Sequence, residues 1–454
     1  MRLELGTSLA RAAGSLSRLA GRGGGTTLPG KLLTTVDPGA IARLARKLPS
    51  GSVLVSATNG KTTTAAMAAT ILSPRFRLAH NAAGANLASG VATALVAARD
   101  AELGLFEVDE AALPQLAAAV QPRAICLSNL FRDQLDRYGE LELVAERWRQ
   151  MAETLPAETL LLLNADDPLV ADLARSRSRT TTFGLDDPAQ RGPSLQHAAD
   201  SKYCVRCGTP YAYDAAYVGH LGDYRCPACG HSRPALDLAA RAVEPHGMDG
   251  ISFDLSSHDG TARIRLRLPG VHNVYNALAA ASLARALDVP LEDIATGLER
   301  ASAAFGRFER VPVDDKTLVV LLIKNPAGAN ESVRTLLQSG GPGVAVVALN
   351  DGIADGRDVS WIWDVDFEPL AQGLERLVAS GERAAELALR FSYGGLDEGR
   401  IEVIPDLAAA LDRGLELTEA GGELVFLPTY TAMLGLQRVI AERGYARPYW
   451  ERVA

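Results

Sequence analysis

Lysine is scarce in this chain of 454 residues, which relies almost entirely on arginine for positive charge. Only six of the 46 basic residues are lysine. An ammonium group is compact and strongly hydrated, whereas a guanidinium is planar and wide, so the two residues serve different sites. We therefore treat each lysine as a candidate for a site that arginine would not serve. The lysines are Lys31, Lys47, Lys61, Lys202, Lys316 and Lys324.

The chain also lacks an excess of positive charge and a long apolar segment. Its 46 basic and 54 acidic residues give a net charge of −8, which argues against a general nucleic-acid binder. No apolar run reaches the roughly 18 residues of a membrane-spanning helix. A hydrophobic fraction of 47% excludes a disordered chain, and the length predicts about three domains.

Cysteine is rare, but four of the five cysteines form two C-x-x-C pairs with 18 residues between them. This spacing is typical of a zinc ribbon, and four thiolates leave a zinc ion no open position for catalysis. Two disulfides or two redox pairs are the alternatives. The segment between the pairs is aromatic but not basic, which argues against nucleic-acid binding. We predict a structural zinc site within residues 200–235, formed by Cys204, Cys207, Cys226 and Cys229.

The first 25 residues carry leucines at helical spacing with arginines among them. A surface helix packed on the body, a helix lying on a membrane surface and a targeting segment all fit this pattern. The segment lacks the continuous apolar core of a secretory signal, so we expect the chain in the cytoplasm.

Short apolar runs alternate with helical segments along the chain, which predicts an α/β fold with parallel sheets covered by helices. Polar sequence with many Gly and Pro residues interrupts the alternation at 180–260. Strand-like sequence returns at 251–255 and 262–268, followed by a helix from about Val274. We expect a helical segment at 1–48, a central domain at 49–305 and a C-terminal α/β domain at 306–454. The main strands are expected at 52–56, 103–108, 124–129, 159–164, 318–323, 344–350, 401–405 and 423–428.

The strongest candidate site is a phosphate-binding loop between the strand at 52–56 and the helix that follows. Backbone N–H groups at a helix N-terminus bind phosphate oxygens. In such loops a lysine reaches the β- and γ-phosphates and the next hydroxyl binds Mg²⁺, roles that fall here on Lys61 and Thr62. Val55 replaces the first glycine of the usual pattern. We predict ATP binding by Thr58, Asn59, Gly60, Lys61 and Thr62.

A magnesium ion at this loop needs a further oxygen ligand from a neighbouring strand end. Glu107, Asp109 and Glu110 lie just after the LGLF run at 103–106, and each is a candidate. A solvated acidic loop is the alternative.

Several motifs together resemble the Mur ligases, the ATP-dependent amino-acid ligases of peptidoglycan synthesis. The likeness is strongest to the MurT group, synthetase subunits that form lipid II isoglutaminyl synthase with the glutaminase GatD. It covers nearly the whole chain and includes the four-cysteine insertion. The motifs are ATNGKTT (57–63), HNAAGANLASG (80–90), LSNLFRDQLDRYGE (127–140), LNADDP (163–168), HNVYNALAAASLA (272–284), GRFERV (306–311), KNPAGANE (324–331) and NDGIADGRDVSWIWDVDFE (350–368).

The resemblance implies roles for further residues. Glu107 matches the family's magnesium glutamate, and Asn81 lies in the loop that faces nucleotide and substrate. Asn273 and Asn276 match the asparagines near the adenine. Arg307 matches the arginine at the domain junction that approaches the phosphates.

The sequence departs from the family in four places. Ala57 stands where glycine is common, and Gln134 stands where many members have a metal-binding histidine. No lysine lies between Lys61 and Lys202, so the carbamylated lysine of many members is missing and a second metal site is in doubt. Only about 50 residues precede the loop, so the usual UDP-binding domain is not included, as suits a lipid-linked substrate.

The resemblance implies amidation of the D-glutamate α-carboxylate of lipid II, by way of an acyl phosphate, at the inner face of the cell membrane. Ammonia would come from a GatD-like class I glutaminase, because the one spare cysteine, Cys126, lies in an apolar strand and is expected to be a core thiol. In the MurT group an aspartate completes the glutaminase Cys–His pair, and we assign it to Asp358, with Asp355 as the alternate. Helix capping is the other interpretation.

Lys324 is a weaker candidate for contact with substrate carboxylate or phosphate, against a structural role. Two other functions share the ATP site. One is an amino-acid ligase of the Mur or folylpolyglutamate synthase type. The other is a zinc-ribbon ATPase that binds nucleic acid, against which the acidic net charge counts.

Overall fold

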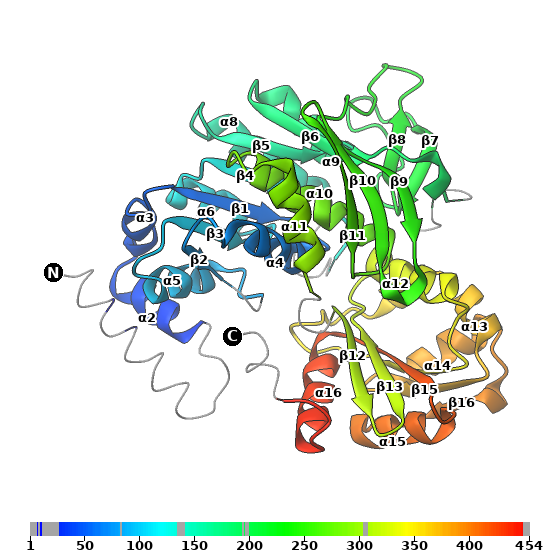
Figure 1. Ribbon diagram of the computed structural model, residues 1–454. Helices are drawn as coiled ribbons and strands as arrows, with labels where there is room; N and C mark the ends of the chain where they lie inside the picture. The colour runs from blue at the N-terminus through cyan, green and yellow to red at the C-terminus, as the bar shows by residue number, and fades with distance from the viewer. Residues whose placement is uncertain are drawn as a thin grey trace.

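The computed structural model describes residues 7, 10, 27–81, 84–133, 141–192, 195, 199–302 and 307–447, without the side chain of Arg307. Figure 1 shows two α/β units, each built on its own sheet. Most of the amphipathic segment at 1–25 and the whole of Gln134 lie outside the described residues. Among the residues that the structure describes, no helix is long and apolar enough to cross a membrane.

The first unit contains a nine-stranded sheet in the order β11-β10-β9-β6-β5-β4-β1-β3-β2. Across this sheet, every neighbouring pair from β9 through β6, β5, β4, β1 and β3 to β2 is parallel. The pairs β9–β10 and β10–β11 are antiparallel, because short turns join these strands. The strands are β1 (Ser52–Ser56), β2 (Leu78–His80), β3 (Leu103–Glu107), β4 (Ala124–Leu127), β5 (Leu160–Asn164), β6 (Thr180–Leu185), β9 (Leu238–Pro245), β10 (Ile251–Ser257) and β11 (Gly260–Leu266).

The predicted break in the sheet at 180–260 is wrong for part of that segment, because β6 and β9 extend the parallel sheet. Their apolar runs are short and mixed with threonine, arginine and glutamate, so the sequence pattern resembled loop. The helix expected from about Val274 starts three residues earlier, at Val271.

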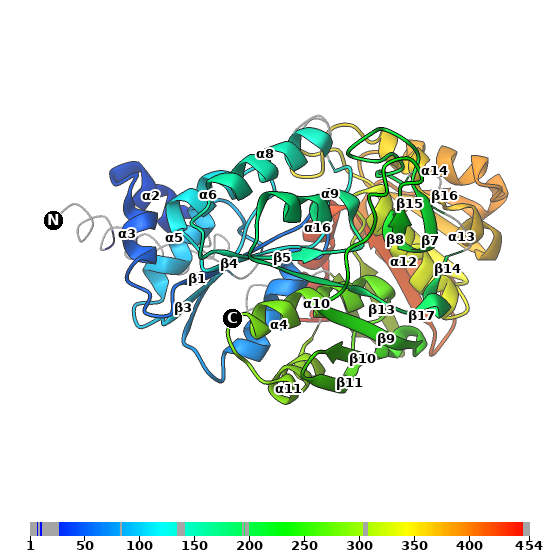
Figure 2. The same cartoon turned by 90° about the horizontal axis from the view of Figure 1, so that it is seen from above.

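Helices cover both faces of this sheet (Figure 2). One core joins the sheet to α4, α10 and α11, and the other joins it to α2, α3, α5, α6 and α8. Small alanine side chains allow α10 to be buried on nearly all sides. The helices are α2 (Leu28–Val36), α3 (Ala40–Ala45), α4 (Lys61–Leu72), α5 (Ala88–Ala97), α6 (Leu113–Val120), α8 (Leu141–Thr154), α9 (Pro168–Ala171), α10 (Val271–Arg285) and α11 (Leu291–Arg300).

The second unit contains a six-stranded sheet in the order β12-β13-β17-β14-β15-β16, antiparallel only between β12 and β13. Apolar cores fill both faces, as expected for an α/β unit. Its strands are β12 (Arg307–Val313), β13 (Lys316–Leu321), β14 (Val344–Ala348), β15 (Arg376–Ser380), β16 (Ile401–Val403) and β17 (Glu423–Pro428). Its helices are α12 (Pro326–Gln338), α13 (Glu368–Gly373), α14 (Ala384–Tyr393), α15 (Leu407–Leu417) and α16 (Tyr430–Glu442).

The cysteine pairs flank a separate two-stranded hairpin of β7 (Ala212–Val218) and β8 (Leu221–Arg225). In Figure 1 this hairpin stands above α12 of the second unit, and the Arg334 guanidinium on α12 donates to the Tyr217 carbonyl. The hairpin therefore bridges the two units. Short 3-10 turns complete the described chain: η1 (Asp172–Ser176), η2 (Pro188–Gln190), η3 (Gly247–Asp249), η4 (Ser360–Asp364) and η5 (Glu398–Arg400).

Candidate active site

The predicted phosphate loop connects β1 to α4 at the carboxyl end of the central sheet. Gly60 has a φ of 87°, and a Cβ there would lie 1.9 Å from Asn276 Oδ1, so the position requires glycine. The next residues, Lys61 and Thr62, open α4, where the first N–H groups have no acceptor within the helix. These amides form an anion-binding end of the kind that holds phosphate.

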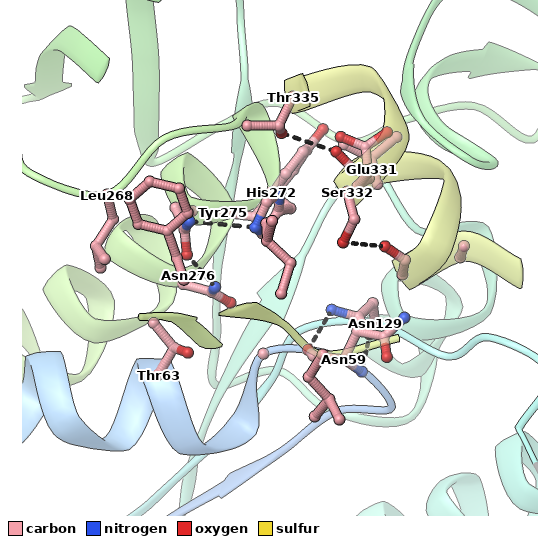
Figure 3. Close-up of a pocket in the computed structure, with 18 of the residues that line it drawn as sticks. Asn59, Thr63, Asn129, Leu268, His272, Tyr275, Asn276, Glu331, Ser332 and Thr335 are labelled. Atoms are coloured by element: carbon pink, nitrogen blue, oxygen red, sulfur yellow. Dashed lines mark hydrogen bonds between the residues drawn. The ribbon is translucent and has the colours of Figure 1, made fainter. Parts of the chain in front are cut away.

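A second loop, which follows β4, holds the phosphate loop in place (Figure 3). Asn59 N–H donates to Asn129 Oδ1 at 2.8 Å, and Asn129 Nδ2 donates back to the Asn59 carbonyl at 3.0 Å. Thr58 N–H donates to the Asn129 carbonyl at 2.9 Å, and Phe131 N–H donates to Thr58 Oγ1 at 3.1 Å. Thr58 and Asn59, expected to contact ATP, thus use their backbone N–H groups to fix the loop.

Lys61 is buried and paired. Its ammonium donates to Glu110 Oε2 at 2.7 Å, to the Thr58 carbonyl at 3.3 Å and to the Ala57 carbonyl. Burial opposes the charge, but the Glu110 carboxylate overcomes it and raises the pKa of Lys61. Burial likewise acts against a charged Glu110, yet Lys61 lowers its pKa overall. Both groups are therefore ionised at neutral pH.

The three acidic candidates have different partners in the structure. Thr62 Oγ1 donates to Glu107 Oε1 at 3.0 Å, so these two predicted magnesium ligands lie side by side. Glu110 pairs with Lys61, and Asp109 Oδ1 accepts from the Ala111 N–H at 3.1 Å. A hydroxyl and a carboxylate in contact offer the hard oxygen donors that Mg²⁺ prefers.

The Asn81 side chain is hydrogen-bonded to the backbone at the end of β3. Its Oδ1 accepts from the Glu107 N–H at 2.9 Å, and its Nδ2 donates to the carbonyls of Glu107 and Ala85 at 2.7 and 2.9 Å. Its amide thus fixes the backbone that presents the Glu107 carboxylate.

A cavity lies between the phosphate loop, α10 and α12. Asn273 and Asn276 lie on its α10 side, and Asn276 Nδ2 donates to Asn273 Oδ1 at 3.0 Å. Apolar side chains from the hairpin and from both units form much of the remaining wall, including Val218, Leu268 and Leu321. A slot with apolar walls and amide groups at one side suits a planar purine base.

Residues of the second unit reach the phosphate loop directly. Asn59 and Asn325 exchange two amide hydrogen bonds of 3.1 and 2.9 Å. Lys324 Nζ donates to the Thr58 carbonyl at 2.9 Å and to Asp133 Oδ2 at 2.5 Å. Burial raises the pKa of Asp133, against the opposing effect of Lys324.

The roles of Asn129, Asn325 and Asp133 were missed by sequence reasoning, although all three lie inside motifs quoted above. Lys324 serves in the contact between the units and also lines the cavity. The side chain of Arg307 lies outside the described part of the chain, so its predicted role stays a prediction.

The two aspartates considered for the partner site lie in different environments. Asp358 is exposed, and its Oδ1 accepts from the Ser360 N–H at 2.9 Å. Hydrogen bonds from the Ser360 hydroxyl and N–H lower the pKa of Asp358. Asp355 is buried and accepts from the backbone and the hydroxyl of Thr431. Asp355 is thus committed to holding its loop against the start of α16, whereas Asp358 is open to solvent.

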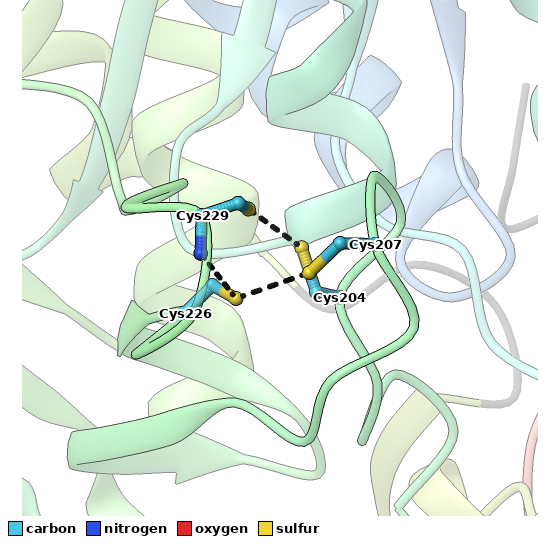
Figure 4. A group of neighbouring side chains, drawn as sticks. All are labelled: Cys204, Cys207, Cys226 and Cys229. Carbon is cyan, nitrogen blue, oxygen red and sulfur yellow. Dashed lines mark hydrogen bonds between the residues drawn. The ribbon is translucent and has the colours of Figure 1, made fainter.

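The four cysteines of the insertion form one cluster (Figure 4), with every Sγ within 4.8 Å of the others. The Sγ atoms of Cys204 and Cys229 lie 3.6 Å apart, and those of Cys207 and Cys226 lie 3.5 Å apart. Tetrahedral Zn–S bonds of about 2.3 Å place neighbouring sulfurs about 3.8 Å apart, so the cluster fits zinc.

Cys126 is fully buried in β4, and burial raises the pKa of its thiol. A buried thiol of this kind is a poor nucleophile. The expectation of a core residue is confirmed.

Replacement of Glu110 by Gln tests the buried pair. The change removes the carboxylate that is hydrogen-bonded to the buried Lys61 ammonium and leaves only the weaker attraction of Glu107 and Asp109, so the free energy of unfolding is expected to fall by about 3 kcal/mol at about pH 7. Glu153→Gln removes one of the two exposed partners of Arg149 and serves as the control, with an expected loss below about 1 kcal/mol. Urea denaturation measures both. Equal losses would contradict the buried-pair interpretation.

The chain matches two protein-family models. The model for the Mur ligase middle domain matches residues 55–219, and the model for the MurT ligase C-terminal region matches residues 322–433. A lipid II isoglutaminyl synthase subunit MurT from Staphylococcus aureus strain N315 is 32% identical over 438 residues, which cover 95% of this chain and 96% of the relative. The corresponding subunit from Streptococcus pneumoniae strain R6 is 32% identical over 455 residues, covering 98% and 99%.

Solved structures agree on the fold. A pseudomurein peptide ligase type C from Methanothermus fervidus superimposes with a TM-score of 0.70 at 22% identity, covering 88% of this chain and 80% of that one. MurF from Thermotoga maritima, in a complex with ADP, gives a TM-score of 0.64 at 14% identity, covering 94% and 85%. The phosphate loop, the two α/β units and the similarity to two MurT subunits along nearly the whole chain show that this protein belongs to the Mur ligase family, in its MurT group.

Proposed function

We propose that this chain is the synthetase subunit of a lipid II isoglutaminyl synthase. It amidates the α-carboxylate of the D-glutamate in the lipid II stem peptide, with ATP as the energy source. The contact of Thr62 with Glu107 beside the N-terminus of α4 carries this proposal, because a hydroxyl and a carboxylate there would suit Mg²⁺ next to a phosphate bound at the helix end. The function of the MurT relatives supports the choice of substrate.

The reaction proceeds in two steps. A carboxylate oxygen of the substrate attacks the γ-phosphorus of ATP, which forms an acyl phosphate and releases ADP. Ammonia then attacks the carbonyl carbon, inorganic phosphate leaves with the former carboxylate oxygen, and the nitrogen loses a proton to give the amide. Both steps depend on positioning and charge neutralisation more than on covalent chemistry by the protein.

The residues of the loop divide this work. The N–H groups of Lys61 and Thr62 lie in the first turn of α4, where they would bind phosphate oxygens. Lys61 is the proposed phosphate lysine, although Glu110 holds its ammonium in the structure. Thr62 and Glu107 are the residues that would hold Mg²⁺, whose charge neutralises the phosphate oxygens when bound. Asn273 and Asn276 face the base.

We assign the supply of ammonia to a partner of the class I glutaminase type, and the MurT relatives support a partner because they are named as subunits of a glutamine-hydrolyzing synthase. Within the described residues the one cysteine outside the zinc cluster, Cys126, is buried. We assign to Asp358 the role of the carboxylate that orients the partner's catalytic histidine, because it is exposed whereas Asp355 is occupied. The cysteine cluster holds zinc in a structural role.

The domain limits that fit this function are 49–305 for the ATP-binding unit with its zinc insertion at about 200–235, and 306–454 for the C-terminal unit, after a helical segment at 1–48. The substrate is membrane-anchored, so the enzyme works at the inner face of the cell membrane.

Co-expression with a class I glutaminase tests the proposed function. The purified complex is incubated with lipid II, ATP and glutamine, and the product is weighed by mass spectrometry. Exchange of a carboxylate OH for NH₂ lowers the mass by about 1 Da, whereas addition of an amino acid raises it far more. An added amino acid would establish the rival ligase function, and unchanged lipid II in a complex that hydrolyses ATP would rule out this substrate.

Asp358→Asn is expected to lower the rate of glutamine-dependent amidation by the complex about 100-fold or more. The reason is that the partner's catalytic histidine loses the correct tautomer without its carboxylate. Amidation with ammonium chloride as the nitrogen source is expected to stay at the wild-type rate. Asp364→Asn changes a half-buried aspartate that ends η4 and pairs with Arg132 at 3.4 Å; it is the control and should keep both activities. Wild-type glutamine hydrolysis by the Asp358 variant would refute the assignment.

Zinc binding is tested by metal analysis of the purified chain. One zinc per chain is expected in the wild type, and Cys204→Ser should lose most of it, because three thiolates hold the ion less tightly. Cys126→Ser removes the one cysteine outside the cluster among the described residues and should keep the metal. Equal zinc contents in the two variants would exclude the proposed site.

A further inference from the structure

The zinc hairpin reaches the nucleotide cavity with the end opposite its cysteines. Val218 ends β7 and Leu221 begins β8, with Gly219 and His220 forming a two-residue turn between them. Val218 and Leu221 line the same cavity as Gly60 and Asn276. An insertion that looks separate in the sequence therefore contributes part of the wall of the ATP site.

The turn is anchored by a histidine that is entirely buried. The His220 ring packs on Phe131, with 4.8 Å between ring centroids. Its Nε2 lies 3.3 Å from Asp167 Oδ2, and the same oxygen accepts from the Leu130 N–H at 2.8 Å. One carboxylate thus joins the hairpin tip to the loop after β4.

That loop is the one that fixes the phosphate loop. The backbone N–H of Phe131 donates to Thr58 Oγ1, and Asn129 is bonded on both sides to the backbone of Asn59. A displacement of His220 would therefore act on Thr58 through Phe131, a single residue. The path from the hairpin tip to the phosphate loop is short and fully buried.

The opposite end of the hairpin depends on the cysteine cluster. The ribbon's small core consists of Cys204, Cys226 and three tyrosines, of which Tyr211 and Tyr224 stand edge to face at 5.0 Å. So small a core holds the cysteine end of the hairpin only with a staple such as a bound metal. The inner end packs in the core of the first unit through Tyr217, Val218 and Leu221, so the metal acts on the tip through the two strands that join the ends.

We propose that the metal-bound hairpin is a structural wall of the nucleotide pocket, and that occupation of the cysteine cluster sets the affinity for ATP and ADP. Val218 and Leu221 contact the nucleotide, and His220 is a positioning residue that holds them and the loop at 129–131 in place. The inference rests on the proposed nucleotide site.

Nucleotide binding to the full chain tests this, with Mg–ADP as the probe and titration calorimetry as the measurement. Val218→Ala removes apolar contact from the pocket wall and should raise the Kd about fivefold. Val205→Ala is the matched control, since Val205 lies on the same ribbon beside Cys204 but outside the cavity lining. It should leave the Kd unchanged. Equal Kd values for both variants would overturn the inference.

His220→Ala separates positioning from general loss of structure. In the complete complex the variant should raise the KM for ATP about tenfold while kcat at saturating ATP stays within about twofold of wild type. Removal of the metal by a chelator should raise the Kd for Mg–ADP about tenfold, and added zinc should restore it.

Unchanged affinity in a metal-free chain that keeps its circular dichroism would also overturn the inference. If the metal-free chain unfolds, the comparison of Val218→Ala with Val205→Ala decides. A wild-type chain that binds no nucleotide would instead refute the proposed function.

Discussion

The site depends on one constraint, the fixing of the phosphate loop by asparagine amides on two sides. Asn129, from the loop after β4, satisfies the backbone of Asn59, and Asn325, from the second unit, pairs with its side chain. A buried amide left without partners costs about 1–3 kcal/mol, so each contact keeps the others in place. The loop therefore presents the N-terminus of α4 in a fixed direction, and the two units share its position.

The buried charges around this loop follow from the same arrangement. Lys61 faces Glu110, and Lys324 faces Asp133. Two ammonium groups and two carboxylates sum to no net charge, so they cannot by themselves neutralise a triphosphate. The remaining positive potential comes from the helix end and from a cation at Thr62 and Glu107. The proposed function therefore depends on the contact between Thr62 and Glu107, because these residues would hold that cation.

The sequence predicts the parts of the site that are local in the chain. An apolar strand, the Gly60–Lys61–Thr62 sequence and an alanine-rich helix indicate the phosphate loop, and the cysteine spacing indicates the metal cluster. The partners across the site could not be predicted, because Asn59 and Asn325 are 266 residues apart and nothing local marks an amide that will pair. The roles of Thr58 and Asn81 were masked in the same way, since their hydrogen bonds go to neighbouring segments. The hairpin tip at His220 carries no motif at all.

The central claim is that the loop delivers the γ-phosphoryl group of ATP to a carboxylate oxygen, and oxygen labelling tests it most directly. Lipid II that carries ¹⁸O in both oxygens of the D-glutamate α-carboxylate is incubated with the glutaminase complex, ATP and glutamine. The released phosphate is then analysed by mass spectrometry. An acyl phosphate intermediate predicts one ¹⁸O atom in each phosphate formed with a molecule of amide. Amide formation with unlabelled phosphate would contradict the account.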